Sequence, residues 1–180
     1  MNKRAYFFIL DAFIGGAVIF LTLMILLNSD NTINQRAREF SEADEYLNFL
    51  DQTQIQDLNN PYVNTLILGG NISDTKNTII EQIHYFHYMI YEGCATQACK
   101  NYYNDTARTM LANITQGLVA EKYGFDYLIK DSEANYSIFS KKLNELTKAR
   151  TVLVARRIAF VPINKTRIYG PNIVEVKVWY

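Results

Sequence analysis

The chain has no net charge, because 18 basic side chains are balanced by 18 acidic ones. Such neutrality is atypical of proteins that bind nucleic acid through its phosphates. Catalytic signatures are also missing: the sequence contains no phosphate-binding P-loop, no G-x-G-x-x-G loop and no G-x-S-x-G elbow. Its two histidines, His84 and His87, lack the spacing of a zinc site, and we expect both on the flank of a helix. We therefore expect no enzyme, no cofactor, no metal site and no nucleic-acid partner.

Apolar and aromatic residues, in contrast, are abundant. Hydrophobic residues occupy 49% of the 180 positions, with 13 Tyr and 10 Phe among them. A chain of this length and composition can bury the core of one ordinary domain. Its charges are segregated: residues 30–133 carry 7 basic and 15 acidic side chains, whereas residues 134–180 carry 9 basic and 2 acidic ones. An acidic block is thus followed by a basic one, behind an apolar N-terminal segment.

The longest apolar run extends from Tyr6 to Leu27 and contains one charged residue. A helix of that length would rise roughly 33 Å, which is enough to cross the hydrocarbon core of a bilayer. The run is not followed by the small-residue cleavage site of a secretory signal peptide. Because Lys3 and Arg4 precede it, the positive-inside rule predicts a single-pass protein of the cell membrane, with a cytoplasmic N-terminus and an extracellular C-terminal domain.

Asp11 is the charged residue of this run. A carboxylate inside the hydrocarbon costs roughly 2.5–3.5 kcal/mol at mid-helix, so it usually has a partner. One interpretation is that Asp11 reaches the cytoplasmic headgroups beside Lys3 and Arg4. A second interpretation depends on the residues that precede the run.

Lys3, Arg4 and Ala5 stand directly before the apolar segment that carries Asp11. This start resembles the class III signal of type IV pilin-like proteins, particularly the archaeal ones. In that family a prepilin peptidase removes the basic leader, and the apolar helix stays on the mature subunit. The resemblance implies cleavage between Ala5 and Tyr6. Cleavage after Tyr6 would instead place Asp11 at the fifth mature position, as in the commonest bacterial pattern.

The resemblance also implies a role for Asp11 in assembly. In such filaments the acidic residue neutralises the N-terminal ammonium group of a neighbouring subunit, which here would be that of Tyr6. Opposite charges offset the cost of desolvating each other in a low dielectric. The implied partners are the membrane, identical or related pilin subunits, the prepilin peptidase and the pilus assembly machinery.

Apolar residues recur at helical spacing beyond the membrane segment, at Ile33, Ala37, Phe40, Ala43, Leu47 and Leu50. We therefore expect a basic leader at 1–5, a transmembrane helix at 6–29, an amphipathic stalk helix at 30–58 and an extracellular head domain at 59–180. One continuous helix from Tyr6 to Leu50 would extend roughly 68 Å. It would have the form of a pilin spine. The alternative is two helices, with a break near residues 28–31.

The head domain is predicted to be α+β, with helices packed on an antiparallel sheet as in pilins. Tyr62–Leu68 reads as an extended link between turns. Helices are expected from Ser73 through Ile90, over Asp105–Glu121 and, as a short piece, over Ser140–Lys148. Strands are expected at Phe125–Lys130, Asn135–Phe139, Thr151–Val161 and in the final run, where Val174, Val176 and Val178 share one face.

Two features of the head are typical of exported proteins. Cys94 and Cys99 are the only cysteines, and their close spacing predicts a disulfide that closes a small loop. Five Asn-x-Ser/Thr sequons make the protein a candidate surface glycoprotein. The candidate glycosylation sites are Asn71, Asn104, Asn113, Asn135 and Asn164.

Two functions are compatible with these features. The first is a structural subunit of an archaeal type IV pilus-like surface filament for adhesion or motility, assembled through its N-terminal apolar helix. The alternative is an uncleaved single-span protein whose outer domain senses or captures a ligand. Tyrosines motivate this alternative, since aromatic rings suit carbohydrate or protein contacts. They are Tyr85, Tyr88, Tyr91, Tyr102 and Tyr103.

Overall fold

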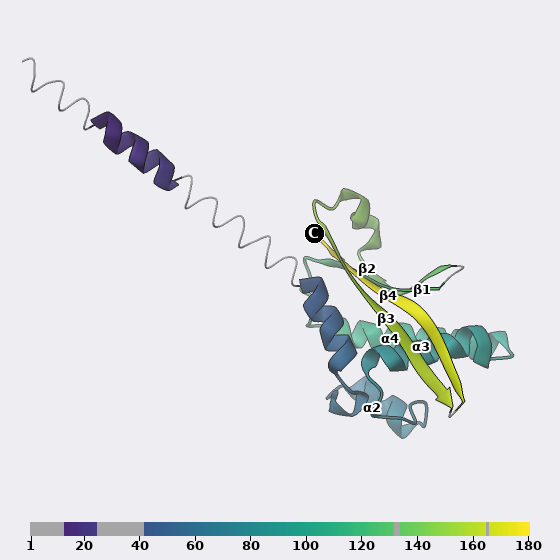
Figure 1. Cartoon of the computed structure of the whole chain (residues 1–180). Coiled ribbons are helices and arrows are strands. Elements are labelled where there is room, and N and C mark those ends of the chain that lie inside the picture. Colours follow the sequence, from purple (N-terminus) through teal and green to yellow (C-terminus); the bar gives the residue numbers. More distant parts are fainter. Residues whose placement is uncertain (1–12, 25–41, 132–133, 165) are drawn as a thin grey trace, which may run out of the picture. The chain divides into compact units, whose positions relative to one another are not determined.

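The computed structural model describes residues 13–24, 42–131, 134–164 and 166–180 (Figure 1). It divides into two units, Met1–Phe40 and Ser41–Tyr180, which are described separately below. In the first unit, residues 13–24 are helical. Within the described ranges, no helix is both long enough and apolar enough to cross a membrane.

This finding contradicts the predicted fold class at its N-terminal part, where a long transmembrane and spine helix was expected. The described helical residues 13–24 would rise roughly 18 Å, which is well short of the roughly 30 Å of a bilayer core. Apolar composition shows that a segment can be buried, but it does not by itself fix the length of a helix. The prediction of one long apolar helix is therefore wrong for the structure, while the α+β architecture of the second unit is observed.

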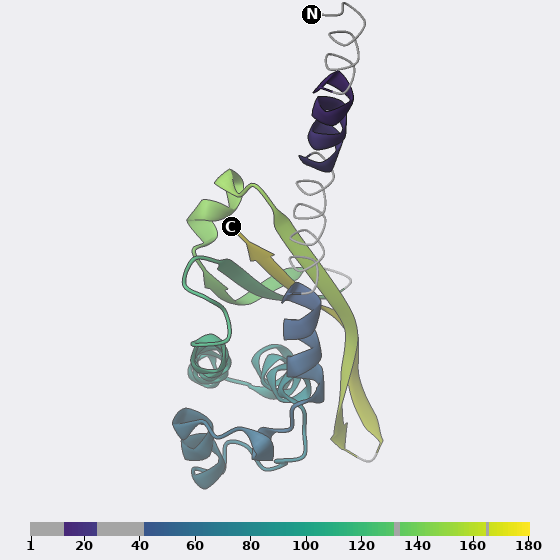
Figure 2. The same ribbon diagram turned by 90° about the vertical axis from the view of Figure 1, so that its left-hand side faces the viewer.

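The second unit contains a four-stranded antiparallel sheet with the strand order β2-β1-β4-β3. Its strands are β1 (Gly124–Lys130), β2 (Asn135–Lys141), β3 (Val152–Asn164) and β4 (Arg167–Trp179). The strand predictions are confirmed, and the strands of the final hairpin are longer than expected. Because β1 pairs with β4 only from Ile173 to Trp179, the outer half of the β3–β4 hairpin extends beyond β1 (Figure 2).

Helices cover one face of this sheet. Residues 42–52 are helical, and α2 (Pro61–Leu68), α3 (Ile79–Tyr88) and α4 (Gln97–Thr115) follow. Short helical segments are η1 (Ile55–Asp57), η2 (Met89–Gly93) and η3 (Leu143–Lys148). The predicted extended link at Tyr62–Leu68 is wrong, because it forms α2. The Asn60 side chain accepts hydrogen bonds from the first turn of α2, and Pro61 fits its first position.

The start of α3 lies later than the predicted Ser73. A reciprocal capping box fixes it: the Glu81 N–H donates to the Thr78 hydroxyl oxygen, and the Thr78 N–H donates to the Glu81 carboxylate at 2.7 Å. These two bonds satisfy backbone donors that a helix otherwise leaves unpaired. The two residues therefore define the boundary of the helix.

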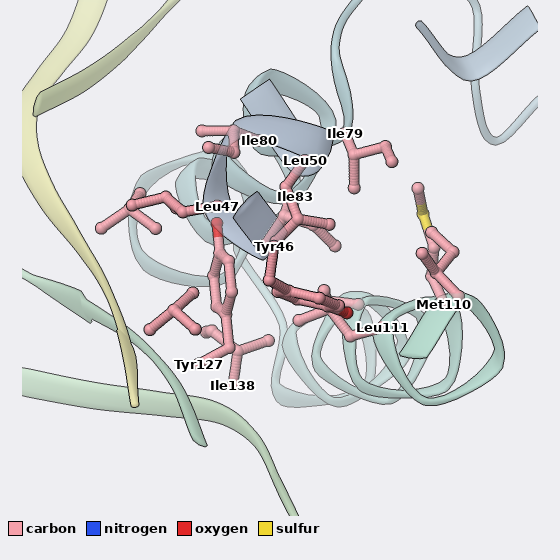
Figure 3. Close-up of a cluster of buried hydrophobic side chains, with 14 of the residues drawn as sticks. Tyr46, Leu47, Leu50, Ile79, Ile80, Ile83, Met110, Leu111, Tyr127 and Ile138 are labelled. Atoms are coloured by element: carbon pink, nitrogen blue, oxygen red, sulfur yellow. The ribbon is translucent and has the colours of Figure 1, made fainter. Parts of the chain in front are cut away.

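The core joins residues 42–52 to α3, α4 and the sheet (Figure 3). Leu47 and Leu50 are fully buried, so the part of the predicted amphipathic stripe that lies in the described residues does face a core. They meet Ile83 from α3, Leu111 from α4 and Tyr127 from β1. Burying one such side chain contributes roughly 1.5–3 kcal/mol to folding. Residues 42–52 are thus an integral part of the second unit.

Candidate functional site

The residues that carry the pilin resemblance lie outside the described residues. They are Ala5 and Tyr6 at the predicted processing site and Asp11 at the predicted assembly site. The described part of the chain contributes the disulfide, the sequons and the surfaces of the second unit.

Cys94 and Cys99 form the predicted disulfide. Cys94 ends the helical run of α3 and η2, and Cys99 lies in the first turn of α4. The Thr96 hydroxyl between them caps α4 by accepting a hydrogen bond from the Cys99 N–H at 3.3 Å. The disulfide therefore links the end of one helical run to the start of the next helix, and it involves no residue of the sheet.

The candidate glycosylation residues occupy different settings. Asn104, Asn135 and Asn164 are exposed, whereas Asn71 and Asn113 are partly buried. The Asn113 side chain donates to the Thr109 carbonyl oxygen within α4, and Asn164 lies near the tip of the β3–β4 hairpin. Accessibility therefore favours Asn104, Asn135 and Asn164 as attachment points.

A cluster of histidines and tyrosines lies between α3 and the β3–β4 hairpin. His84 and His87 are fully buried, so the expectation that they lie on a helix flank is wrong. The His87 Nδ1 atom and the Tyr169 hydroxyl share a hydrogen bond of 2.9 Å, and the Tyr91 and Tyr136 rings lie 4.5 and 5.0 Å from the His87 ring, centroid to centroid. Helix and hairpin are joined here through polar aromatic groups.

Burial sets the charge state of this cluster. Desolvation, with a smaller contribution from the charge of His87, lowers the pKa of His84 to about 4. Desolvation also lowers the pKa of His87 to about 4, against the opposing effect of the Asp131 carboxylate. Burial raises the pKa of Tyr169 to about 12. Both imidazoles and the phenol are therefore neutral near pH 7.

A polar cavity of about 360 Å³ adjoins this cluster. Glu92 and Arg167 form an ion pair on its wall, and Asp131, Tyr169 and Asn172 line it. Asn172 is 7% exposed, and its amide nitrogen has no hydrogen-bond partner among the described residues. The cavity thus combines hydrogen-bond donors and acceptors beside an aromatic ring.

A charged network occupies the outer face of the sheet, away from the helices. The Glu175 carboxylate is 1% exposed and accepts hydrogen bonds from Lys130 at 2.8 Å and Arg156 at 2.5 Å, with Lys177 at 3.5 Å. Burial alone raises the pKa of Glu175, but the hydrogen bonds and charges of Lys130 and Arg156 outweigh it and lower the pKa. Neighbouring Asp126 has a raised pKa, chiefly because of burial. Three cations therefore surround two carboxylates on this face.

Comparisons with family models, with curated proteins and with solved structures found no match to this chain. Within the described ranges, no group of three or more metal-ligating side chains is close enough to hold a metal ion.

Sequence reasoning did not find the buried histidine cluster or the Glu175 network. His87 and Tyr169 are 82 residues apart, and Lys130 and Glu175 are 45 apart. Because successive side chains of a strand point to opposite faces, the sequence places Glu175 on the face of β4 that does not carry the valines. This pattern carries no information on which cations lie beside the Glu175 carboxylate. Such contacts depend on strand order, for which the sequence offers no local signal.

Proposed function

We propose that the chain is a structural subunit of an archaeal type IV pilus-like surface filament used for adhesion or motility. The observation that carries the proposal is the basic leader ending at Ala5, directly before the apolar segment with Asp11. In this proposal, prepilin peptidase cleaves between Ala5 and Tyr6. The N-terminal segment then associates with the membrane and with neighbouring subunits, and the unit Ser41–Tyr180 is extracellular.

The second unit supports the proposal in two ways. Residues 42–52 belong to its core, so a folded α+β unit follows the N-terminal segment in the chain. Its disulfide and its exposed sequon residues suit the cell exterior. A folded unit behind an apolar assembly segment is the arrangement that a filament subunit requires.

Mass spectrometry of cell-surface material tests the processing step. The mature protein is expected to lack residues 1–5 and to begin at Tyr6, and cleavage after Tyr6 would keep the proposal with a shifted site. An Ala5→Glu variant should accumulate as the unprocessed precursor, with Asn2→Ala as the matched control. Surface filaments built from chains that retain Met1 would overturn the proposal.

Substitution of Asp11 tests assembly. Asp11→Asn keeps the shape of the side chain but removes its charge, so filaments should fall at least tenfold while membrane insertion is unchanged. Asp11→Glu serves as the charged control and should retain assembly. Electron microscopy and the amount of shed filament are the measurements, and normal filaments from the Asn variant would contradict the assigned role.

One observation favours ligand capture as a second candidate function. The cavity beside Tyr169 offers the Asn172 amide and the charged groups of Glu92 and Arg167. Such a set suits a ligand rich in hydroxyl groups, as carbohydrates are. Titration of the full-length chain with neutral oligosaccharides, read by tyrosine fluorescence, tests this candidate. Equal responses from the unmodified chain and Asn172→Ala would argue against it.

A further inference from the structure

The part of the β3–β4 hairpin that projects beyond β1 is attached to the second unit differently from the rest of the sheet (Figure 2). We call residues 159–164 and 166–172 the distal hairpin. β4 pairs with β1 only from Ile173 onward, and β3 is an edge strand. The register between β3 and β4 also shifts directly after Ala159, as at a bulge, which bends a strand. The backbone pairing that anchors β4 to β1 therefore stops before the distal hairpin.

Two polar contacts fasten the distal hairpin to the helical run of α3 and η2. The Tyr169 hydroxyl shares a hydrogen bond of 2.9 Å with the His87 Nδ1 atom. The Tyr169 ring lies 5.9 Å from the His87 ring and 6.4 Å from the His84 ring, centroid to centroid. Arg167, two residues earlier on β4, forms an ion pair with Glu92 of η2. The position of the distal hairpin thus depends on groups that can carry charge.

The two histidines beside Tyr169 are in a setting that disfavours a proton. Both are fully buried, and neither ring nitrogen of His84 has a hydrogen-bond partner among the described residues. The His87 Nε2 atom is likewise without a partner there. The two rings lie 6.2 Å apart, so two imidazolium groups would repel each other. A buried charge without a partner is costly, and the closed contact therefore requires neutral histidines.

Tyrosines are the main titratable groups that neighbouring elements place against α3. They are Tyr91 of η2, Tyr103 of α4, Tyr136 of β2 and Tyr169 of β4. β3 also packs against α3 and contributes Arg157, whose guanidinium donates to Asn48 at 2.6 Å. The Asp131 carboxylate, between β1 and β2, favours the charged form of His87. Burial outweighs this effect, because the pKa values of both histidines are lowered to about 4.

We propose that the distal hairpin is a pH-sensitive latch, which is closed on α3 while His84 and His87 are neutral and is released by acid while the inner half of β4 stays paired with β1. The latch does not depend on the filament function. In the open form both imidazoles reach water, where their ordinary pKa is about 6.5. Between that value and the lower pKa of the closed form, only the open form takes up protons. Each histidine therefore raises the open population by up to roughly tenfold for each pH unit below 6.5.

Hydrogen exchange of the full-length chain in detergent micelles, read by mass spectrometry at pH 7 and pH 5, tests the latch. After correction for intrinsic exchange rates, the protection of the distal hairpin should fall by at least roughly tenfold from pH 7 to pH 5. The internal reference is Ile173–Trp179, the part of β4 that pairs with β1. At pH 5 the distal hairpin should be protected at least roughly tenfold less than this reference, because it opens without unfolding of the sheet.

Two variants identify the trigger. His84→Gln with His87→Gln keeps polar side chains that do not titrate, so protection of the distal hairpin should change less than about twofold between the two pH values. Glu92→Gln is the matched control, because it removes the ion pair with Arg167 at every pH and leaves both histidines. It should lower protection at both pH values and keep the full pH dependence. If the double variant does not fold, His87→Gln alone should reduce the pH dependence at least roughly threefold.

Three results would overturn the latch. Equal protection of the distal hairpin and Ile173–Trp179 at pH 5 would show that acid acts only through unfolding of the whole unit. Full pH dependence in the histidine variants would show that other groups respond to acid. Loss of the pH dependence in Glu92→Gln would assign the trigger to the ion pair. Because none of these measurements requires assembled filaments, the filament proposal stands or fails separately.

Discussion

Trp179 shows how one residue constrains its neighbour in the sheet. Its indole is almost fully buried and lies over Gly124, its direct partner on β1. A Cβ atom at position 124 would lie only 2.0 Å from the indole Cε2 atom, so no other residue fits without movement of the ring. Glycine is required here by close approach and not by its backbone angles.

We predict that Gly124→Ala lowers the free energy of unfolding by roughly 1–3 kcal/mol, because the added methyl group must displace the indole. Urea denaturation monitored by tryptophan fluorescence measures the loss. The control is the same substitution in a Trp179→Leu background, followed by circular dichroism, where the clash is absent and the cost should fall below about 1 kcal/mol. Equal costs in both backgrounds would show that the indole is not the cause.

His84 and His87 make stability dependent on pH. Their pKa values are about 4 in the folded chain, below the ordinary value of about 6.5, because burial disfavours the charged form. Their contribution to stability is therefore fully present above pH 6.5 and is lost as the pH falls toward 4. The Asp131 carboxylate favours the charged form of His87 and therefore reduces this loss of stability.

We predict that the free energy of unfolding falls by roughly 1–2 kcal/mol per histidine between pH 7 and pH 5. The His84→Gln variant, which keeps a polar side chain but does not titrate, should lose correspondingly less over the same range. Urea denaturation midpoints at both pH values provide the measurement. The assignment fails if this variant and the unmodified chain lose equal stability.

At the scale of elements, the strands were predictable and the helix boundaries were not. Alternation at Val174, Val176 and Val178 identifies the buried face of β4, because residues two apart share a face. The Thr78 and Glu81 capping box was present in the sequence, yet Ser73 offered a competing start. Asn60 and Pro61 likewise mark α2, whose eight residues are too short for helical periodicity to be evident. The buried histidines depend on tertiary packing.

The disulfide acts at the same scale, because it connects the end of η2 to the start of α4. A loop of this length contributes about 2 kcal/mol in the chain-entropy model. We predict that Cys94→Ala with Cys99→Ala lowers the free energy of unfolding by that amount while the sheet is retained. The reduced unmodified chain is the control and should match the double variant in urea. A complete loss of folded structure would show that the bond does more than restrain one corner.

At the scale of the whole molecule, the segregated charges of the sequence correspond to different elements. The acidic block, residues 30–133, supplies the helices of the second unit other than η3 together with β1, whereas the basic block supplies β2, η3, β3 and β4. Part of this charge is neutralised inside the unit, as at Glu92 and Arg167. The remainder leaves an acidic and a basic part within one chain, which is a basis for attraction between copies.

We predict that the proposed filaments weaken as salt rises, because the exposed charges that join copies are screened beyond about 3 Å at 1 M ionic strength. Raising sodium chloride from about 0.05 M to about 1 M should release several times more subunits, measured by sedimentation. The double variant Glu42→Gln with Glu45→Gln removes two negative charges from the acidic block at nearly unchanged side-chain size, so its filaments should be weaker at low salt and should respond less to added salt. If the unmodified filaments are indifferent to salt, apolar contacts alone hold them, and the charge segregation serves the folding of each subunit.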